Sequence, residues 1–214
     1  MSLTETLAEV SAGSAKRIPP EAIATMEKAT ADFRSAGIGA TALKPGDTLP
    51  DATMTDATGQ SVTLSDLLAK GSLILNFYRG GWCPYCNFEM KAYQDLLPEI
   101  TAAGATLVGV TPEKPDNALS TIEKNELTYP VLTDAGNEFA KALGLVFELT
   151  GDLKALYEGF GLDLPKHNEE SGWTLPIPAV YVVGADGKIL FADVDLDYRR
   201  RAEPSDAVAA LKAS

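Results

Sequence analysis

Cysteine and histidine are scarce in this chain, and their scarcity limits the chemistry open to it. The 214 residues include two cysteines and one histidine, His167. A structural zinc site takes about four ligands, drawn mostly from these two residue types. The sequence therefore disfavours a metal site, and we expect His167 to lie in a polar surface loop.

Long apolar segments and excess positive charge are also missing. No hydrophobic run approaches the ~20 residues that span a membrane, and the start, MSLTETLAEV, lacks the basic and apolar parts of a signal peptide. Acidic side chains outnumber basic ones by 30 to 18, a net charge of −12 that disfavours nucleic acid as a partner. We therefore expect a cytoplasmic protein without a membrane or nucleic-acid partner.

The rest of the composition is typical of a soluble globular protein, with 45% hydrophobic and 22% charged residues. The length suits one domain better than two. The sequence predicts mainly helix over residues 1–44, with an interruption at Pro19-Pro20 and a stop at Gly37, but this segment holds too few large apolar residues to form a core. We expect an N-terminal helical extension over 1–44 and one α/β domain over 45–214.

Strands and helices alternate along the second region. Two continuous apolar runs, SLILNFY (72–78) and ATLVGVT (105–111), predict strands buried on both faces. Helices are expected over 84–104 with a kink at Pro98, and over 116–127, 137–145, 151–160 and 203–213. A short strand is expected over 129–134, with hairpins turning at 56–59 and at Asp186-Gly187.

Both cysteines lie in GGWCPYC, residues 80–86, directly after the first buried run. If a helix begins at Pro84, Cys83 is its N-cap residue and Cys86 lies in its first turn. Unpaired backbone N–H groups and the helix dipole favour a thiolate there, and the spacing is compatible with a disulfide. A metal half-site, a structural disulfide and two inert core thiols are the alternatives to a redox pair, which this position favours.

Several fragments, taken in order, resemble a known family. WCPYC resembles the active site of the thioredoxin fold, and IPAVYVV (177–183) resembles the segment in which that fold places a cis-proline. A longer series of fragments resembles the peroxiredoxins of the alkyl hydroperoxide reductase and thiol-specific antioxidant group. These fragments are LKPGDTLPD, VTLSDL, LILNFYRGGWC, VGVTPEK, YPVLTD and VVGADGKI. DYRRRAEP (197–204) resembles a branch of this family with a Cys-x-x-Cys.

The resemblance implies a thioredoxin-like fold, with a mixed central sheet flanked by helices, and a thiol-dependent peroxidase. Cys86 aligns with the peroxidatic cysteine of the family motif Pro-x-x-x-Thr-x-x-Cys, so it would attack a hydroperoxide and Cys83 would resolve the sulfenic acid. A thioredoxin- or glutaredoxin-type thiol would then reduce the disulfide, without a bound cofactor. The implied active-site shell is Trp82, Tyr85, Arg79 and Pro178, the last being the cis residue beside Cys83. The family also implies a homodimer, with the helical extension available for that contact.

The chain departs from the family motif at three positions. Arg79 stands at the proline position, Cys83 at the threonine position, and Phe191 where an arginine is usual. We expect Arg79 or one of Arg199–Arg201 to supply the missing charge. The departures keep two alternatives open: a dithiol/disulfide oxidoreductase with Cys83 as the nucleophile, and a redox-switched binding protein.

Overall fold

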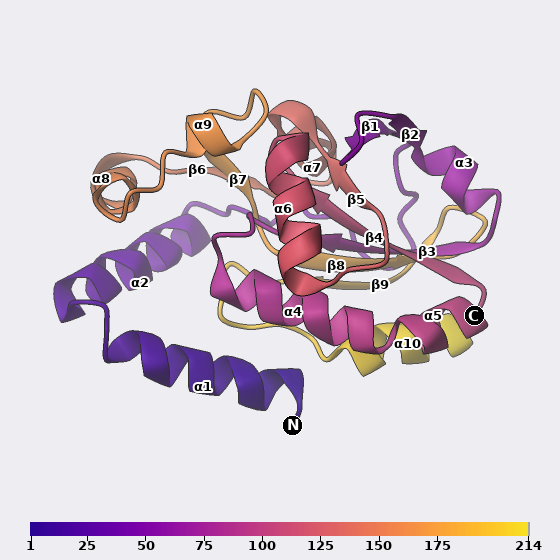
Figure 1. Ribbon diagram of the computed structural model, residues 1–214, viewed down its shortest axis with the longest axis horizontal. Helices are drawn as coiled ribbons and strands as arrows, with labels where there is room; N and C mark the ends of the chain where they lie inside the picture. Colours follow the sequence, from indigo (N-terminus) through magenta and orange to yellow (C-terminus); the bar gives the residue numbers. More distant parts are fainter. Residues whose placement is uncertain (214) are drawn as a thin grey trace.

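The computed structural model describes residues 1–213, and its centre is a mixed seven-stranded sheet in the order β2-β1-β5-β4-β3-β8-β9 (Figure 1). β3, β4 and β5 run parallel, and the other neighbours pair antiparallel. The strands are β1 Thr53–Asp56, β2 Ser61–Thr63, β3 Ser72–Phe77, β4 Ala105–Thr111, β5 Val131–Thr133, β8 Ala179–Val183 and β9 Ile189–Val194. A second sheet pairs β6 Val146–Glu148 with β7 Thr174–Pro176.

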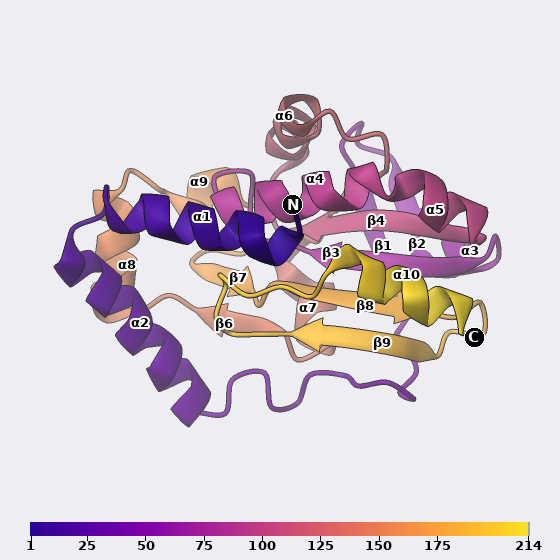
Figure 2. The ribbon, with the colours of Figure 1, turned by 90° about the horizontal axis from the view of Figure 1, so that it is seen from below.

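Helices cover both faces of the large sheet. Figure 2 shows α1, α4, α5 and α10 along one side of it, and their apolar residues share one buried cluster. Residues of α3 and α7 pack on the other face. The helices are α1 Leu3–Ala15, α2 Pro20–Ser35, α3 Leu64–Leu68, α4 Pro84–Asp95, α5 Leu97–Ala102, α6 Pro115–Asn125, α7 Glu138–Ala142, α8 Gly151–Gly159, α9 Leu164–His167 and α10 Pro204–Lys212, with a 3-10 turn at Ala135–Asn137.

The strand that leads to the cysteines is buried on both faces, as its continuous apolar run predicts. Leu73, Leu75 and Phe77 point into one cluster, and Ile74 and Tyr78 point into the other. All five side chains have no exposed surface. Successive residues of a strand face opposite sides, so a strand covered on both sides is apolar at nearly every position, and Asn76 is the buried polar exception in β3.

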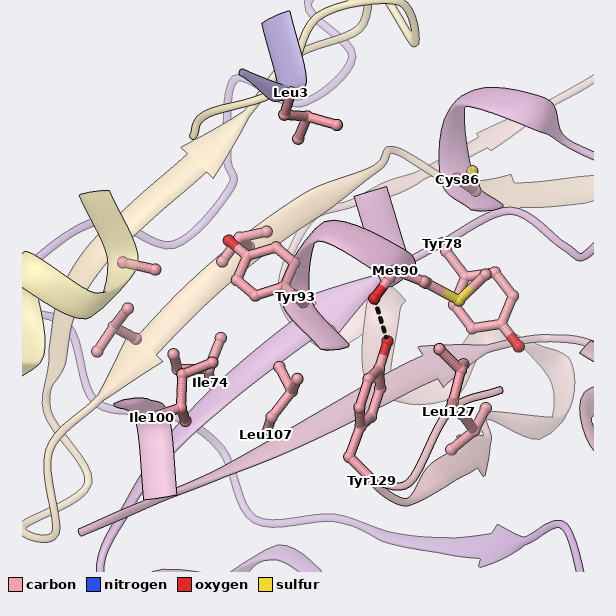
Figure 3. Close-up of a cluster of buried hydrophobic side chains, with 14 of the residues drawn as sticks. Leu3, Ile74, Tyr78, Cys86, Met90, Tyr93, Ile100, Leu107, Leu127 and Tyr129 are labelled. Atoms are coloured by element: carbon pink, nitrogen blue, oxygen red, sulfur yellow. Dashed lines mark hydrogen bonds between the residues drawn. The ribbon is translucent and has the colours of Figure 1, made fainter. Parts of the chain in front are cut away.

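The cluster under α4 extends to the cysteines. Cys83 and Cys86 both belong to it, and Figure 3 shows Cys86 together with Met90 and Tyr129. The Tyr129 hydroxyl donates a hydrogen bond to the backbone carbonyl of Met90 at 3.2 Å, which ties α4 to the segment before β5. The helix that carries both sulfurs is therefore fixed by close packing over most of its length.

The first two helices form what we call the N-terminal arm, defined as α1 and α2. α1 lies beside α4, and α2 lies beside α8 (Figures 1 and 2). The Glu203 carboxylate accepts hydrogen bonds from the Leu3 and Thr4 backbone N–H groups and from the Thr4 hydroxyl, at 3.0, 2.8 and 2.6 Å. A negative charge at a helix N-terminus is favourable, so Glu203 anchors the arm to the segment before α10.

The structure confirms the predicted α/β fold class and most of the predicted elements. The helix expected over 84–104 is divided at Leu96, two residues before Pro98, because proline restricts the residues that precede it. The helix stop predicted at Gly37 is confirmed: α2 ends at Ser35, and the chain turns where Gly37 and Gly39 have φ of 73° and 78°. Within residues 1–213, no helix is both long and apolar enough to cross a membrane.

Candidate active site

A tight turn of two glycines carries the chain from β3 to α4. Gly80 has a positive φ of 151°, and a Cβ there would collide with the indole of Trp82. A Cβ on Gly81 would collide with the Thr121 hydroxyl of α6. Both positions therefore require glycine, which places the following cysteine directly against the sheet.

The first cysteine is the N-cap residue of α4, as predicted. Cys83 has φ −87° and ψ 113°, and Pro84 is the first helical residue. The Cys83 backbone N–H donates to the carbonyl of Gly80 at 3.0 Å, and its own carbonyl accepts from the Asn87 N–H at 3.1 Å. Cys86 then lies within the first turn, so both sulfurs are near the positive end of the helix dipole.

Each sulfur faces an arginine. Both cysteines are free thiols with no exposed surface. Nη2 of Arg79 donates a hydrogen bond to Sγ of Cys83 at 3.1 Å. Nη2 of Arg201 lies 3.8 Å from Sγ of Cys86 and donates to it. Arg79 and Arg201 therefore supply the positive charge that the family usually has at the position of Phe191, and both are among the candidates expected from the sequence.

The surroundings shift the pKa values of the two thiols in opposite directions. Burial alone would raise the pKa of Cys83, but the hydrogen bond from Cys86 and the charges of Arg79 and Arg201 outweigh it, and the pKa lies well below its usual value. The pKa of Cys86 is raised by burial, by its hydrogen bond to Cys83 and by the negative charge there. The hydrogen bond from Cys86 and the nearby guanidinium of Arg79 therefore favour the thiolate form on Cys83.

Aromatic side chains hold Arg79 in place. Its Nη1 donates to the hydroxyl of Tyr157 at 3.0 Å, and its guanidinium lies 4.2 Å from the ring centre of Tyr198 and 5.2 Å from that of Trp82. Trp82 meets Tyr157 edge to face at 5.8 Å, and Tyr85 meets Tyr198 in the same way at 5.4 Å. This arrangement keeps the cation directed at Cys83 despite its burial.

Arg201 is held by a buried carboxylate. Its Nε donates to Oε2 of Glu89 at 2.7 Å, and the two side chains are 2% and 0% exposed. Its Nη1 donates to the backbone carbonyls of Tyr198 and Arg200, both at 2.6 Å. Burial raises the pKa of Glu89 in spite of the opposing charge of Arg201. The pair thus costs desolvation energy, and it fixes a cation beside Cys86.

Of the four residues predicted for the active-site shell, Arg79 contacts the Cys83 sulfur, and Pro178 differs from its prediction. Trp82 and Tyr85 belong to the aromatic group around Arg79, as described above. Pro178 lines a small cavity together with Arg79, but the prediction of a cis-proline is wrong, since residues 1–213 contain no cis peptide bond. A trans bond continues the extended chain from β7 into β8, where the Ile177 N–H donates to the carbonyl of Leu145 at 2.6 Å.

Other residues with metal-binding or catalytic potential have structural roles. His167 ends α9 and its backbone carbonyl accepts from Lys114 and Asn117, so the expected loop is a short helix. Asp193 accepts from the Ala202 N–H at 2.8 Å, which holds the chain segment that carries Arg201. Within the described part of the chain, no three His, Cys, Asp or Glu side chains gather in a way that could hold a metal ion.

Comparison with known proteins points to one family. The sequence model of the AhpC/TSA family matches residues 45–192. A putative peroxiredoxin of Mycobacterium tuberculosis is 31% identical over 158 residues, which cover 73% of this chain and 88% of that protein. The thiol-disulfide oxidoreductase ResA of Bacillus cereus is 25% identical over 146 residues, which cover 68% of this chain and 66% of that protein.

Solved structures agree on the fold. The crystal structure of peroxidoxin BcpB from Mycobacterium tuberculosis superposes with a TM-score of 0.63 at 26% identity, covering 80% of this chain and 97% of that one. Peroxiredoxin Q of Xylella fastidiosa, solved as a cysteine-to-serine mutant, gives a TM-score of 0.62 at 20% identity, covering 80% of this chain and 96% of that one. The predicted thioredoxin-like fold of the peroxiredoxins is thereby confirmed.

Proposed function

The chain belongs to the AhpC/TSA family, and we propose that it is a thiol-dependent peroxidase that reduces hydroperoxides with Cys83 and Cys86. The observation that carries this proposal is the pair of buried sulfurs at the start of α4, each facing an arginine. A thiolate is the reactive form of cysteine, and a cation beside it can also stabilise the oxyanion that leaves when the peroxide bond breaks.

The reaction proceeds in three balanced steps. A cysteine thiolate attacks the terminal oxygen of a hydroperoxide, ROOH, so that the O–O bond breaks, a proton is taken up, and ROH leaves with a sulfenic acid formed on the sulfur. The second thiol condenses with that sulfenic acid, releasing water and forming the Cys83–Cys86 disulfide. An external dithiol then gives two electrons and two protons to the disulfide and becomes oxidised itself.

The choice of attacking cysteine rests on the location of the charge. We assign the attack to Cys83, because the pKa of its thiol is lowered and its sulfur receives a hydrogen bond from Arg79 at 3.1 Å. The family motif predicts the reverse, attack by Cys86 with Cys83 resolving. The motif and the electrostatics thus assign the attack to different cysteines, and single-cysteine variants decide between them.

The external partners follow from this chemistry. The family's reaction needs a hydroperoxide and a thiol reductant, and we propose a thioredoxin- or glutaredoxin-type protein as the reductant, acting in the cytoplasm. The cysteine thiols carry the redox chemistry, so the proposal includes no prosthetic group. We also propose a homodimer and keep the division into an extension over 1–44 and a catalytic domain over 45–214.

The proposal predicts the stoichiometry of oxidation. We expect the reduced protein to contain two titratable thiols and to lose both after one equivalent of hydroperoxide, because the sulfenic acid condenses with its neighbour. Thiol titration with and without a dithiol reductant measures this change. Two thiols that persist after one equivalent of peroxide would contradict the proposal.

One observation favours a second function. Cys83 is a buried N-cap thiolate in a Cys-x-x-Cys, which is also the arrangement that attacks a protein disulfide, with Cys86 resolving the mixed disulfide. The similarity to ResA agrees with this alternative. A protein that reduces disulfide substrates rapidly, but reacts with hydroperoxide no faster than free cysteine, would have this function instead.

A further inference from the structure

A cavity of about 320 Å³ lies between the N-terminal arm and the active site. We call it the arm pocket. On one side it is lined by Ser14, Ile23 and Met26 of the arm, and on the other by Arg79, Trp82 and Tyr157. Its wall is mostly apolar and aromatic. Cavities of this size and character are typical of sites for small organic molecules.

The arm is an addition to the family's part of the chain. The family match begins at residue 45, whereas α1 ends at Ala15 and α2 ends at Ser35. Glu203 anchors the start of α1, and α2 packs beside α8. The arm is therefore attached at both helices, and it supplies one wall of a cavity whose other wall contains the arginine that contacts Cys83.

Two residues of the inner wall, Arg79 and Trp82, each carry a buried hydrogen-bond donor without a partner. Nε of Arg79 and Nε1 of Trp82 are buried and have no hydrogen-bond partner within the described residues. A buried N–H group without an acceptor is unfavourable, so a ligand oxygen would be stabilised if it reached either nitrogen. Nη2 of the same Arg79 donates to Sγ of Cys83 at 3.1 Å.

We propose that the arm pocket selects hydroperoxides with a bulky apolar body, so that the N-terminal arm determines the substrate specificity of this chain. The apolar body would lie against the arm and the aromatic side chains, where its removal from water favours binding. The peroxide oxygens would lie at Arg79, next to the Cys83 sulfur. This inference rests on the proposed peroxidase function and adds the substrate class to it.

A pair of tryptophan substitutions on α1 tests this inference. Ser14 is half-buried and lines the pocket, whereas Ala12 is exposed on the same helix and does not line it. We expect Ser14→Trp to lower kcat/KM for cumene hydroperoxide at least about tenfold, because a filled pocket excludes the ring. For hydrogen peroxide, which needs no such space, kcat/KM should stay within about twofold. Ala12→Trp should leave both values unchanged.

A binding measurement tests the pocket without any turnover. The alcohol product of cumene hydroperoxide, 2-phenyl-2-propanol, has the same apolar body and cannot oxidise a thiol. Calorimetry should show saturable binding to the reduced wild type and to Ala12→Trp, with affinity at least about tenfold lower in Ser14→Trp. The wild-type result does not depend on whether Ser14→Trp folds.

The possible outcomes distinguish a failure of the arm-pocket inference from a failure of the proposed peroxidase function on which it rests. Rapid reaction with hydrogen peroxide, combined with no saturable binding of the alcohol by the wild type, would overturn the pocket's role and leave the peroxidase intact. An equal loss of rate for both hydroperoxides in Ser14→Trp would also overturn it. Slow reaction with both hydroperoxides in the wild type would overturn the peroxidase function itself, whatever the alcohol binding shows.

Discussion

Replacing Cys83 by serine is expected to lower the rate of hydroperoxide consumption at least about 100-fold, because loss of an attacking nucleophile costs orders of magnitude. The pKa of the Cys83 thiol is lowered, and Arg79 donates a hydrogen bond to its sulfur. Cys86→Ser should keep one rapid oxidation and then stop, because no second thiol remains to condense with the sulfenic acid. Stopped-flow kinetics and trapping with dimedone, located by peptide mass spectrometry, measure both effects.

The two variants serve as each other's control, since each keeps one sulfur and removes the same disulfide. The account expects dimedone on Cys83 in the Cys86→Ser variant. A rapid oxidation that persists in Cys83→Ser, with dimedone on Cys86, would contradict the assignment made from the charges. It would instead support the prediction made from the family motif.

Replacing Arg201 by methionine is expected to destabilise the fold by about 3–5 kcal/mol at neutral pH, because it leaves a buried carboxylate without its partner. Arg201 and Glu89 are 2% and 0% exposed. The pKa of Glu89 already lies above its unfolded value of about 4.3, and loss of the cation should raise it further. Such a carboxyl is more readily protonated in the folded state, so the variant should lose stability as pH rises above about 4.3.

A neighbouring arginine provides the control for this prediction. Arg199 pairs with Asp197 and Glu27, and its side chain is 34% exposed. Arg199→Met should therefore change the free energy of unfolding by at most about 1 kcal/mol. The double variant Glu89→Gln, Arg201→Met should recover part of the lost stability, because neither member of the pair then carries a buried charge. Urea unfolding at several pH values measures all three, and equal effects of the two single arginine variants would contradict this account of the pair.

Much of the fold could be predicted because its signals are local. The run SLILNFY is apolar at nearly every position, which only a strand buried on both faces requires, and the structure places it in β3 at the centre of the sheet. The consecutive glycines at 80–81 and Pro84 are local signals of a turn and of a helix start, so they located the start of α4, although the close contact that requires Gly81 comes from the distant Thr121. β6 and β7 escaped prediction because they are three residues each and are paired only by the tertiary fold.

The candidate site could be predicted only in part, because most of it is assembled from distant segments. Cys83, Cys86 and Trp82 are close together in sequence, whereas Tyr157 and Tyr198 reach Arg79 from far along the chain. The Arg199–Arg201 cluster was a visible signal, but sequence could not show which member reaches a sulfur. That choice depends on the buried carboxylate of Glu89, 112 positions away in the chain from its partner.

The rate at which the fully reduced wild type reacts with a hydroperoxide tests the central claim most directly. Stopped-flow mixing of the protein with hydrogen peroxide, and separately with cumene hydroperoxide, should follow the loss of thiols under pseudo-first-order conditions, with free cysteine measured alongside at the same pH. The account predicts a second-order rate constant at least about 100-fold above that of free cysteine for one or both substrates, because a stabilised thiolate next to Arg79 and Arg201 lowers the barrier to O–O cleavage. A rate constant no greater than that of free cysteine for both would contradict it.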